Sequence, residues 1–114
     1  MSDALLFAPL YRQQEYEDYL EAREAAIDAM VPELAAQLEL DQDFCGLAMS
    51  ELSGDPVQDI VNACGPFFAR YKAAETVEQE ARAGYALYRL IKPYIEAAAK
   101  DQAESDARNK VGKA

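Results

Sequence analysis

The sequence predicts an all-α protein, a single-domain bundle of four to five helices, some of them kinked at internal prolines. The 114 residues are rich in Ala, Leu, Glu and Gln, side chains that lose little freedom in a helix. No run alternates apolar and polar residues for long enough to form a strand. Apolar residues recur instead at steps of three and four, which is the period of one helix face.

The first helix is expected from about Leu10, after Pro9, to Val31. Its apolar series keeps the same phase past Pro32. That proline fits the first position of a new helix, because the N–H there has no intrahelical partner in any case. The sequence is therefore compatible with a helix that is kinked at Pro32 and with a new helix that starts there.

A short helix is expected within residues 41–54, with Gly54 as its C-terminal stop. Asp55 as N-cap and Pro56 at the first helical position would start the next helix. In that helix Gly65-Pro66 falls inside an apolar series whose phase survives on both sides. An interior proline costs roughly 3 kcal/mol or more, yet a chain that left the helix would lose this register. We expect a bent helix here and no loop.

Thr76 and Gln79 have the spacing of a capping box and precede the longest regular pattern in the chain. The helix they start is apolar on two faces as far as Ala99, so we expect it to lie between neighbours. From residue 100 the sequence loses apolar residues and gains mixed charge. Residues 1–99 are therefore expected to form an acidic helical domain, and residues 100–114 a C-terminal helical extension or a mobile tail.

The net charge of −10 is unevenly distributed along the chain. Residues 1–60 carry −12 and residues 61–114 carry +2. An acidic field repels nucleic acid and anionic membranes and attracts basic proteins. The N-terminal sequence has no basic region typical of a signal peptide, and no apolar run approaches the roughly 18 residues of a membrane span. We expect a cytoplasmic protein whose two cysteines stay reduced.

The residue types exclude several classes of enzyme. The chain has no histidine, so it lacks the usual general base, the Cys-His and Ser-His pairs and the Glu-x-x-His motif of di-metal bundles. Asp41 and Asp43 take the first and third positions of a calcium loop, but Leu52 stands where the bidentate Glu is required. Helix capping explains these aspartates better. We expect no catalysis, no cofactor and no metal; an enzyme that uses paired carboxylates alone is the weakest hypothesis.

An uncompensated row of carboxylates is the strongest candidate for a binding site. Four acidic residues of the first helix follow i, i+4, i+7, i+11 spacing, and none has a Lys or Arg three or four residues away. Such a row is mildly destabilising by itself. The alternative is an ordinary solvated face. Two neighbouring tyrosines have a composition typical of interfaces, or else lie at the edge of the core. The predicted partner-binding residues are Glu17, Glu21, Glu24, Asp28, Tyr16 and Tyr19.

These observations predict a non-catalytic acidic protein-binding module that docks on a basic surface of a partner protein. In its sharpest form it is an inhibitor whose carboxylates mimic nucleic-acid phosphates and so block a nucleic-acid-binding enzyme. Direct binding of nucleic acid or membrane is not expected. The alternative is a helical structural or assembly protein that forms a homo-oligomer through a heptad-like stripe. That stripe consists of Ala81, Gly84, Tyr88, Ile91 and Ile95.

Overall fold

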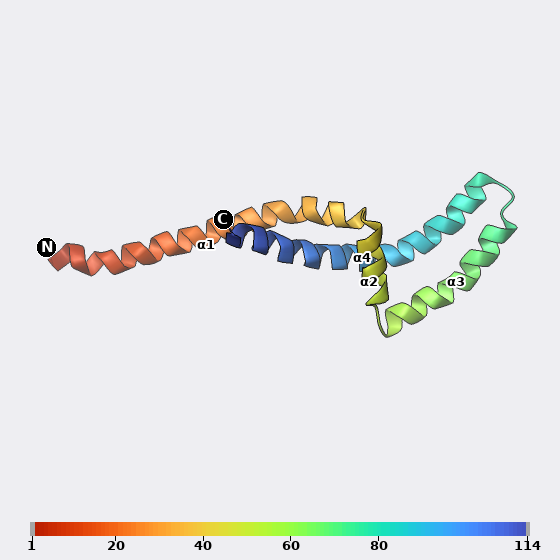
Figure 1. Cartoon of the computed structure of the whole chain (residues 1–114), viewed down its shortest axis with the longest axis horizontal. Coiled ribbons are helices and arrows are strands. Elements are labelled where there is room, and N and C mark those ends of the chain that lie inside the picture. The colour runs from red at the N-terminus through yellow and green to blue at the C-terminus, as the bar shows by residue number, and fades with distance from the viewer. Residues whose placement is uncertain (1, 114) are drawn as a thin grey trace.

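A computed structural model describes the backbone of residues 2–113 and the side chains of residues 12–112. Within residues 2–113 the chain forms four α-helices and no strand (Figure 1), which confirms the all-α prediction. The helices are α1 (Ser2–Glu39), α2 (Gln42–Ser50), α3 (Asp55–Ala73) and α4 (Val77–Lys113).

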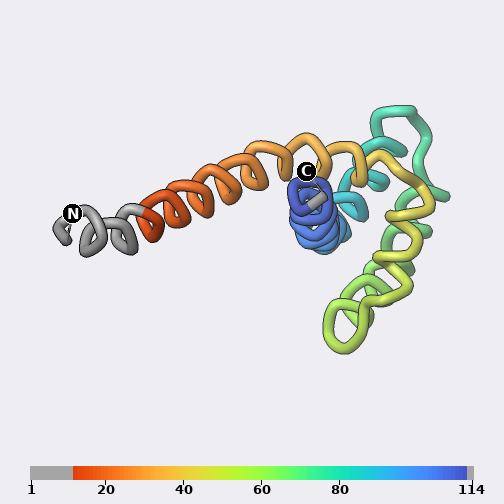
Figure 2. The backbone as a smooth tube through the Cα atoms, turned by 60° about the vertical axis from the view of Figure 1, so that its left-hand side comes forward, coloured from red at the N-terminus to blue at the C-terminus, as the bar shows by residue number. Residues whose placement is uncertain are grey.

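The molecule is elongated, which differs from the compact bundle expected. It measures 86 × 29 × 19 Å and has a radius of gyration of 23.3 Å, whereas a compact domain of this length has roughly 13 Å. Helix α4 is the spine: α3 runs along one end of it and the second half of α1 along the other (Figures 1 and 2). The helices therefore pair in succession along α4, and do not surround one shared core.

Alanines of α4 are prominent among the buried residues of the chain. Ala99, Ala103 and Ala107 are fully buried at steps of four residues, and Ile27 is 1% exposed. Small side chains let two helix backbones approach closely. Helix α4 continues to Lys113, so residues 100–113 are helical, and the buried alanine face has no break at residue 99.

Side-chain caps fix the starts of two helices where the sequence predicts them. The Asp41 carboxylate accepts a hydrogen bond from the Phe44 N–H at 3.0 Å, at the start of α2. At the start of α4 the Gln79 N–H donates to the Thr76 hydroxyl at 3.2 Å. In return the Gln79 side-chain oxygen accepts from the Glu75 N–H at 2.7 Å. These bonds satisfy donors that lack an intrahelical partner.

The turn between α2 and α3 depends on a glycine. Gly54 has φ 75° and ψ −143°, a conformation that residues with a Cβ rarely adopt. It is also the N-cap of α3, and no side chain caps this end. The prediction that Asp55 is the N-cap is wrong by one position, because Asp55 is already the first helical residue and Pro56 lies in the first turn.

Internal prolines do not end the helices. Helix α1 passes through Pro9 and Pro32 without a break, so neither the start expected at Leu10 nor a restart at Pro32 occurs. Helix α3 continues through Pro66, which excludes a loop at residues 64–67. Helix α4 continues through Pro93 and changes direction along its length (Figure 1). A proline removes one hydrogen bond of the ladder, and the neighbouring turns are sufficient to continue the helix.

Candidate functional site

The N-terminal part of α1 projects beyond the rest of the molecule. Gly112, near the end of α4, lies beside the Arg23 side chain, and α1 extends past this point without a second helix against it (Figures 1 and 2). Tyr16 and Tyr19 lie on this projecting part and are 62% and 61% exposed. The structure thus places both predicted tyrosines mainly in solvent.

Three of the four predicted carboxylates are exposed and have no cationic partner among the described side chains. Glu17 accepts one long hydrogen bond, at 3.5 Å, from the Gln13 amide. Neither Glu21 nor Asp28 takes part in a side-chain hydrogen bond or an ion pair within residues 12–112. Because these groups remain hydrated, they are free to pair with cations from another molecule.

Glu24 differs from the rest of the row because α4 supplies it with a cation. Arg108 donates two hydrogen bonds to its carboxylate, at 2.9 and 3.4 Å. These bonds, aided by the positive charges of Arg108 and Arg23, lower the pKa of Glu24. The same bond raises the pKa of Arg108, and the nearby charges of Glu104 and Asp28 act in the same direction. Glu24 therefore also joins α1 to α4.

Sequence reasoning could not detect the pair between Glu24 and Arg108. The two residues are 84 positions apart, whereas a search for compensating charge on a helix covers only three or four positions. The other ion pair among the described side chains joins Lys92 to Glu96 at 3.6 Å within α4, and it leaves the carboxylate row unaffected.

A second group of aromatic and charged side chains lies on α4. The rings of Tyr85 and Tyr88 stack with centroids 6.0 Å apart. Arg89 lies over the Tyr85 ring and Lys92 over the Tyr88 ring, each at 5.9 Å, which is within the range of cation–π attraction. Tyr85 and Tyr88 are 59% and 52% exposed, so Tyr88 does not pack into the core of its own chain. The signal in the sequence was the i, i+4 spacing of each ring and cation.

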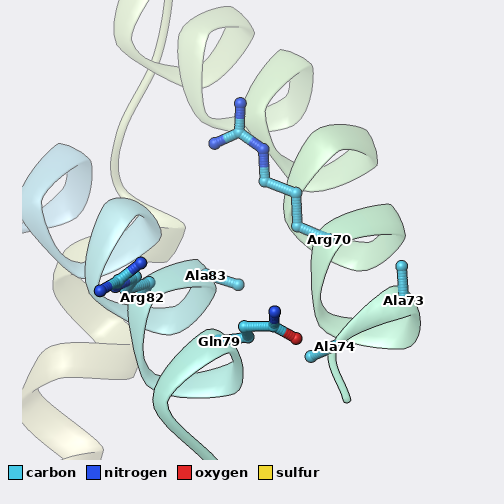
Figure 3. A pocket seen from close by; sticks show the side chains of 6 residues that line it. All are labelled: Arg70, Ala73, Ala74, Gln79, Arg82 and Ala83. Carbon is cyan, nitrogen blue, oxygen red and sulfur yellow. The ribbon is translucent and has the colours of Figure 1, made fainter. Parts of the chain in front are cut away.

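A cleft of about 340 Å³ lies between the end of α3 and the start of α4 (Figure 3). Alanines form much of its wall, and the guanidinium groups of Arg70 and Arg82 do not converge on one point. The Gln79 side chain already accepts the capping bond from Glu75. Within the same part of the chain, no three Cys, Asp or Glu residues are placed to hold a metal ion.

Comparison with known proteins gives no match: no family model, curated protein or solved structure is similar to this chain. Over the described residues, none of the helices has an apolar stretch long enough to cross a bilayer.

Proposed function

We propose that this chain is a non-catalytic binding module that works in contact with another protein chain. The observation that carries the proposal is the exposed surface of 8981 Å². A compact monomer of 12.6 kDa exposes roughly 6,200 Å². A surface far larger than folding requires is of use to a protein that binds others.

The projecting part of α1 is the surface proposed for a basic partner. Glu17 and Glu21 supply free carboxylates, and Tyr16 and Tyr19 supply exposed aromatic area beside them. Aromatic residues next to hydrogen-bonding groups are enriched at binding hot spots. Asp28 lies on the same edge of α1 as Glu17 and Glu21, and we call these three residues the acidic edge. Glu24 would contribute fully only if the partner displaced Arg108.

Nucleic-acid mimicry is the sharper form of this proposal. Four carboxylates from Glu17 to Asp28 span eleven residue steps, or roughly 16 Å of helix at about 1.5 Å per residue. With Arg108 displaced from Glu24, this gives one charge per roughly 5.5 Å, compared with one per 3.4 Å along a DNA strand. The row would then have about three-fifths of the linear charge density of one strand. A nucleic-acid-binding enzyme is accordingly the class of partner that we propose.

Matched charge variants test the acidic edge. Glu17→Gln with Glu21→Gln removes two charges from the row. Glu15→Gln with Glu33→Gln removes two from the opposite edge of α1, so the net charge of the two variants is equal. Each protein would serve as bait in host lysate at low and high salt, with captured proteins quantified by mass spectrometry. We expect a basic partner to be lost, on the order of tenfold, with the first variant and with high salt, but retained by the second. Equal capture by both variants, or capture insensitive to salt, would contradict the proposal.

Self-association is the second candidate function. It is favoured by the large apolar side chains that the single chain leaves exposed on α3 and α4, among them Val61, Phe68 and Tyr88. Light scattering distinguishes this function from the first. A stable symmetric oligomer supports an assembly role, and a monomer at micromolar concentration excludes it.

A further inference from the structure

Helix α3 carries an apolar stripe that the described part of the chain leaves largely exposed. Val61, Phe68 and Tyr71 are 58%, 67% and 48% exposed, Val57 is 36% exposed, and Cys64 is also exposed. These residues follow i, i+4, i+7, i+11, i+14 spacing and so form one line along the helix. We call these five residues the α3 stripe.

The α3 stripe is separate from the side of α3 that packs on α4. Phe67 and Ile60 are half-buried. A cleft of about 210 Å³ between the two helices is lined by Ala63, Pro66 and Arg70 of α3, and by no residue of the stripe. At about 100° per residue, the centre of the stripe lies roughly a third of a turn from this packed side. The stripe therefore faces mainly outward, away from the packed side of α3.

The surface beside the middle of the stripe is uncharged, although 28% of all residues are charged. The neighbouring positions on its outer flank there are Gln58, Asn62, Gly65 and Ala69, and the charged Lys72 lies at the C-terminal end of this flank. A Cβ placed on Gly65 would meet no other atom within 4 Å, so packing within the chain does not require a glycine there. An uncharged surface with small residues at its edge permits close approach of a second helix.

The stripe has the internal symmetry that a two-fold contact requires. Val57 and Tyr71 lie seven residues before and after Cys64, and Val61 and Phe68 lie three before and four after it. An antiparallel copy turned about an axis near Cys64 would thus bring Val61 against Phe68 and Val57 against Tyr71. Two-fold interfaces use one patch on both subunits, which must complement itself in this way.

Area and charge both favour a second copy as the occupant. The chain exposes roughly 2,800 Å² more than a compact monomer, and a stable interface requires about 800 Å² per partner. This excess belongs to the elongated chain as a whole, which includes both the projecting α1 and the stripe. The stripe and the acidic start of α1 lie at opposite ends of the molecule (Figure 1). Contact at the stripe therefore leaves the acidic starts of α1 in the two copies apart. Helix α3 itself is acidic in its first turn, at Asp55, and basic in its last turn, at Arg70 and Lys72, so an antiparallel copy would place opposite charges close together.

We propose that two copies of this chain pair through the α3 stripe, with α3 antiparallel to its counterpart about a two-fold axis near Cys64. The proposal rests on self-association as the second candidate function and specifies its surface. It uses neither Glu17 nor Glu21, so the acidic edge remains free in the dimer.

Two matched substitutions test the contact in the full chain. Phe68→Asp places a charge in the stripe, while Val77→Asp places one at an exposed apolar residue at the start of α4 that neither proposal uses. Sedimentation equilibrium should show that Phe68→Asp raises the dimer dissociation constant at least about 100-fold, and that Val77→Asp changes it little. Circular dichroism should show both variants as helical as the parent, because neither side chain is buried in the single chain.

A short bis-maleimide provides an independent measure of the axis position. Each thiolate adds across one maleimide double bond with no leaving group, so the reagent joins two cysteines only where they lie close together. Cys45→Ala retains Cys64 and should give a cross-linked dimer. Cys64→Ala retains Cys45 and should give almost none.

The outcomes separate this proposal from the others. A parent chain that is monomeric at micromolar concentration overturns both the stripe contact and self-association, and leaves binding to a basic partner intact. A dimer that tolerates Phe68→Asp, or that is joined through Cys45, overturns the stripe alone.

Discussion

Replacing Ile27 by alanine tests whether the junction of α1 and α4 holds the structure together. Ile27 is 1% exposed and is the largest fully buried side chain described. On α1, Ile27 lies between Arg23 and Val31. Arg23 is beside Gly112 of α4, and Val31 lines a cleft together with Lys100 of α4. Because the helices are antiparallel, this position is level with the buried Ala103 and Ala107. The substitution would therefore create a cavity at the centre of the contact.

The expected loss of stability follows from the atoms removed. Isoleucine has three more carbons than alanine, and each buried CH₂ contributes about 0.8 kcal/mol, so the transfer loss is about 2.4 kcal/mol. Measured Ile→Ala costs in cores range from about 2 to 5 kcal/mol because a cavity term adds to it. We expect the lower part of this range, since few layers of protein surround the site and the exposed surroundings can relax.

Urea unfolding followed by circular dichroism at one protein concentration would measure the effect. With a slope near 1.5 kcal/mol/M, a loss of about 2.4 kcal/mol lowers the midpoint by roughly 1.6 M. Leu20→Ala is the matched control, because Leu20 lies on the same helix but is 37% exposed; it should cost less than about 1 kcal/mol. Equal costs for the two variants would refute the view that α1 is held by packing against α4.

Two further pairs of measurements test single features of the structure. Gly54→Ala should destabilise the chain by about 1–3 kcal/mol because of its positive φ. Gly46→Ala, in a helix with open space around its Cβ, should stabilise it by about 0.5–1 kcal/mol; the same sign for both in thermal melts would contradict this account. The lowered pKa of Glu24 means that its bond to Arg108 stabilises the folded state above the ordinary glutamate pKa and is lost as the pH falls through the lowered value. Glu24→Gln should therefore be less stable than the parent at pH 7, with the difference in melting temperature shrinking as the pH falls below the ordinary glutamate pKa and the Glu24 carboxylate becomes protonated. A difference that does not shrink as the pH falls would show that the charge of Glu24 is not the cause.

Local signals in the sequence predicted the helix boundaries that depend on nearby residues. Asp41 caps α2, and Thr76 with Gln79 caps α4, because a cap involves side chains only a few residues from the N–H groups they bind. Prolines were a less reliable guide to helix boundaries. Pro9 and Pro32 suggested boundaries where α1 has none, because a proline removes one hydrogen bond while the rest of the helix supplies many.

Features that depend on distant parts of the chain could not be predicted in the same way. The periodicity of α3 identifies its apolar residues but does not show which of them meet α4 and which face outward. The fully buried Ala99, Ala103 and Ala107 were present in the sequence at steps of four, yet alanine is too weakly apolar to distinguish a buried face from an exposed one. The ion pair of Glu24 with Arg108 depends on how α1 and α4 align, which no local pattern specifies.

The serial arrangement of helices along α4 has a consequence for cooperativity. Among the described residues α1 and α3 do not contact each other, and α4 touches both. Each end of the molecule is thus a helical pair, and the two pairs are joined by the continuous helix α4 and by the short helix α2, which contacts α1 and α4, as in a short linear array. Hydrogen exchange should then resolve two units with different opening free energies. Substitutions in α3 should alter protection in the first half of α4 and leave the junction around Ala103 nearly unchanged.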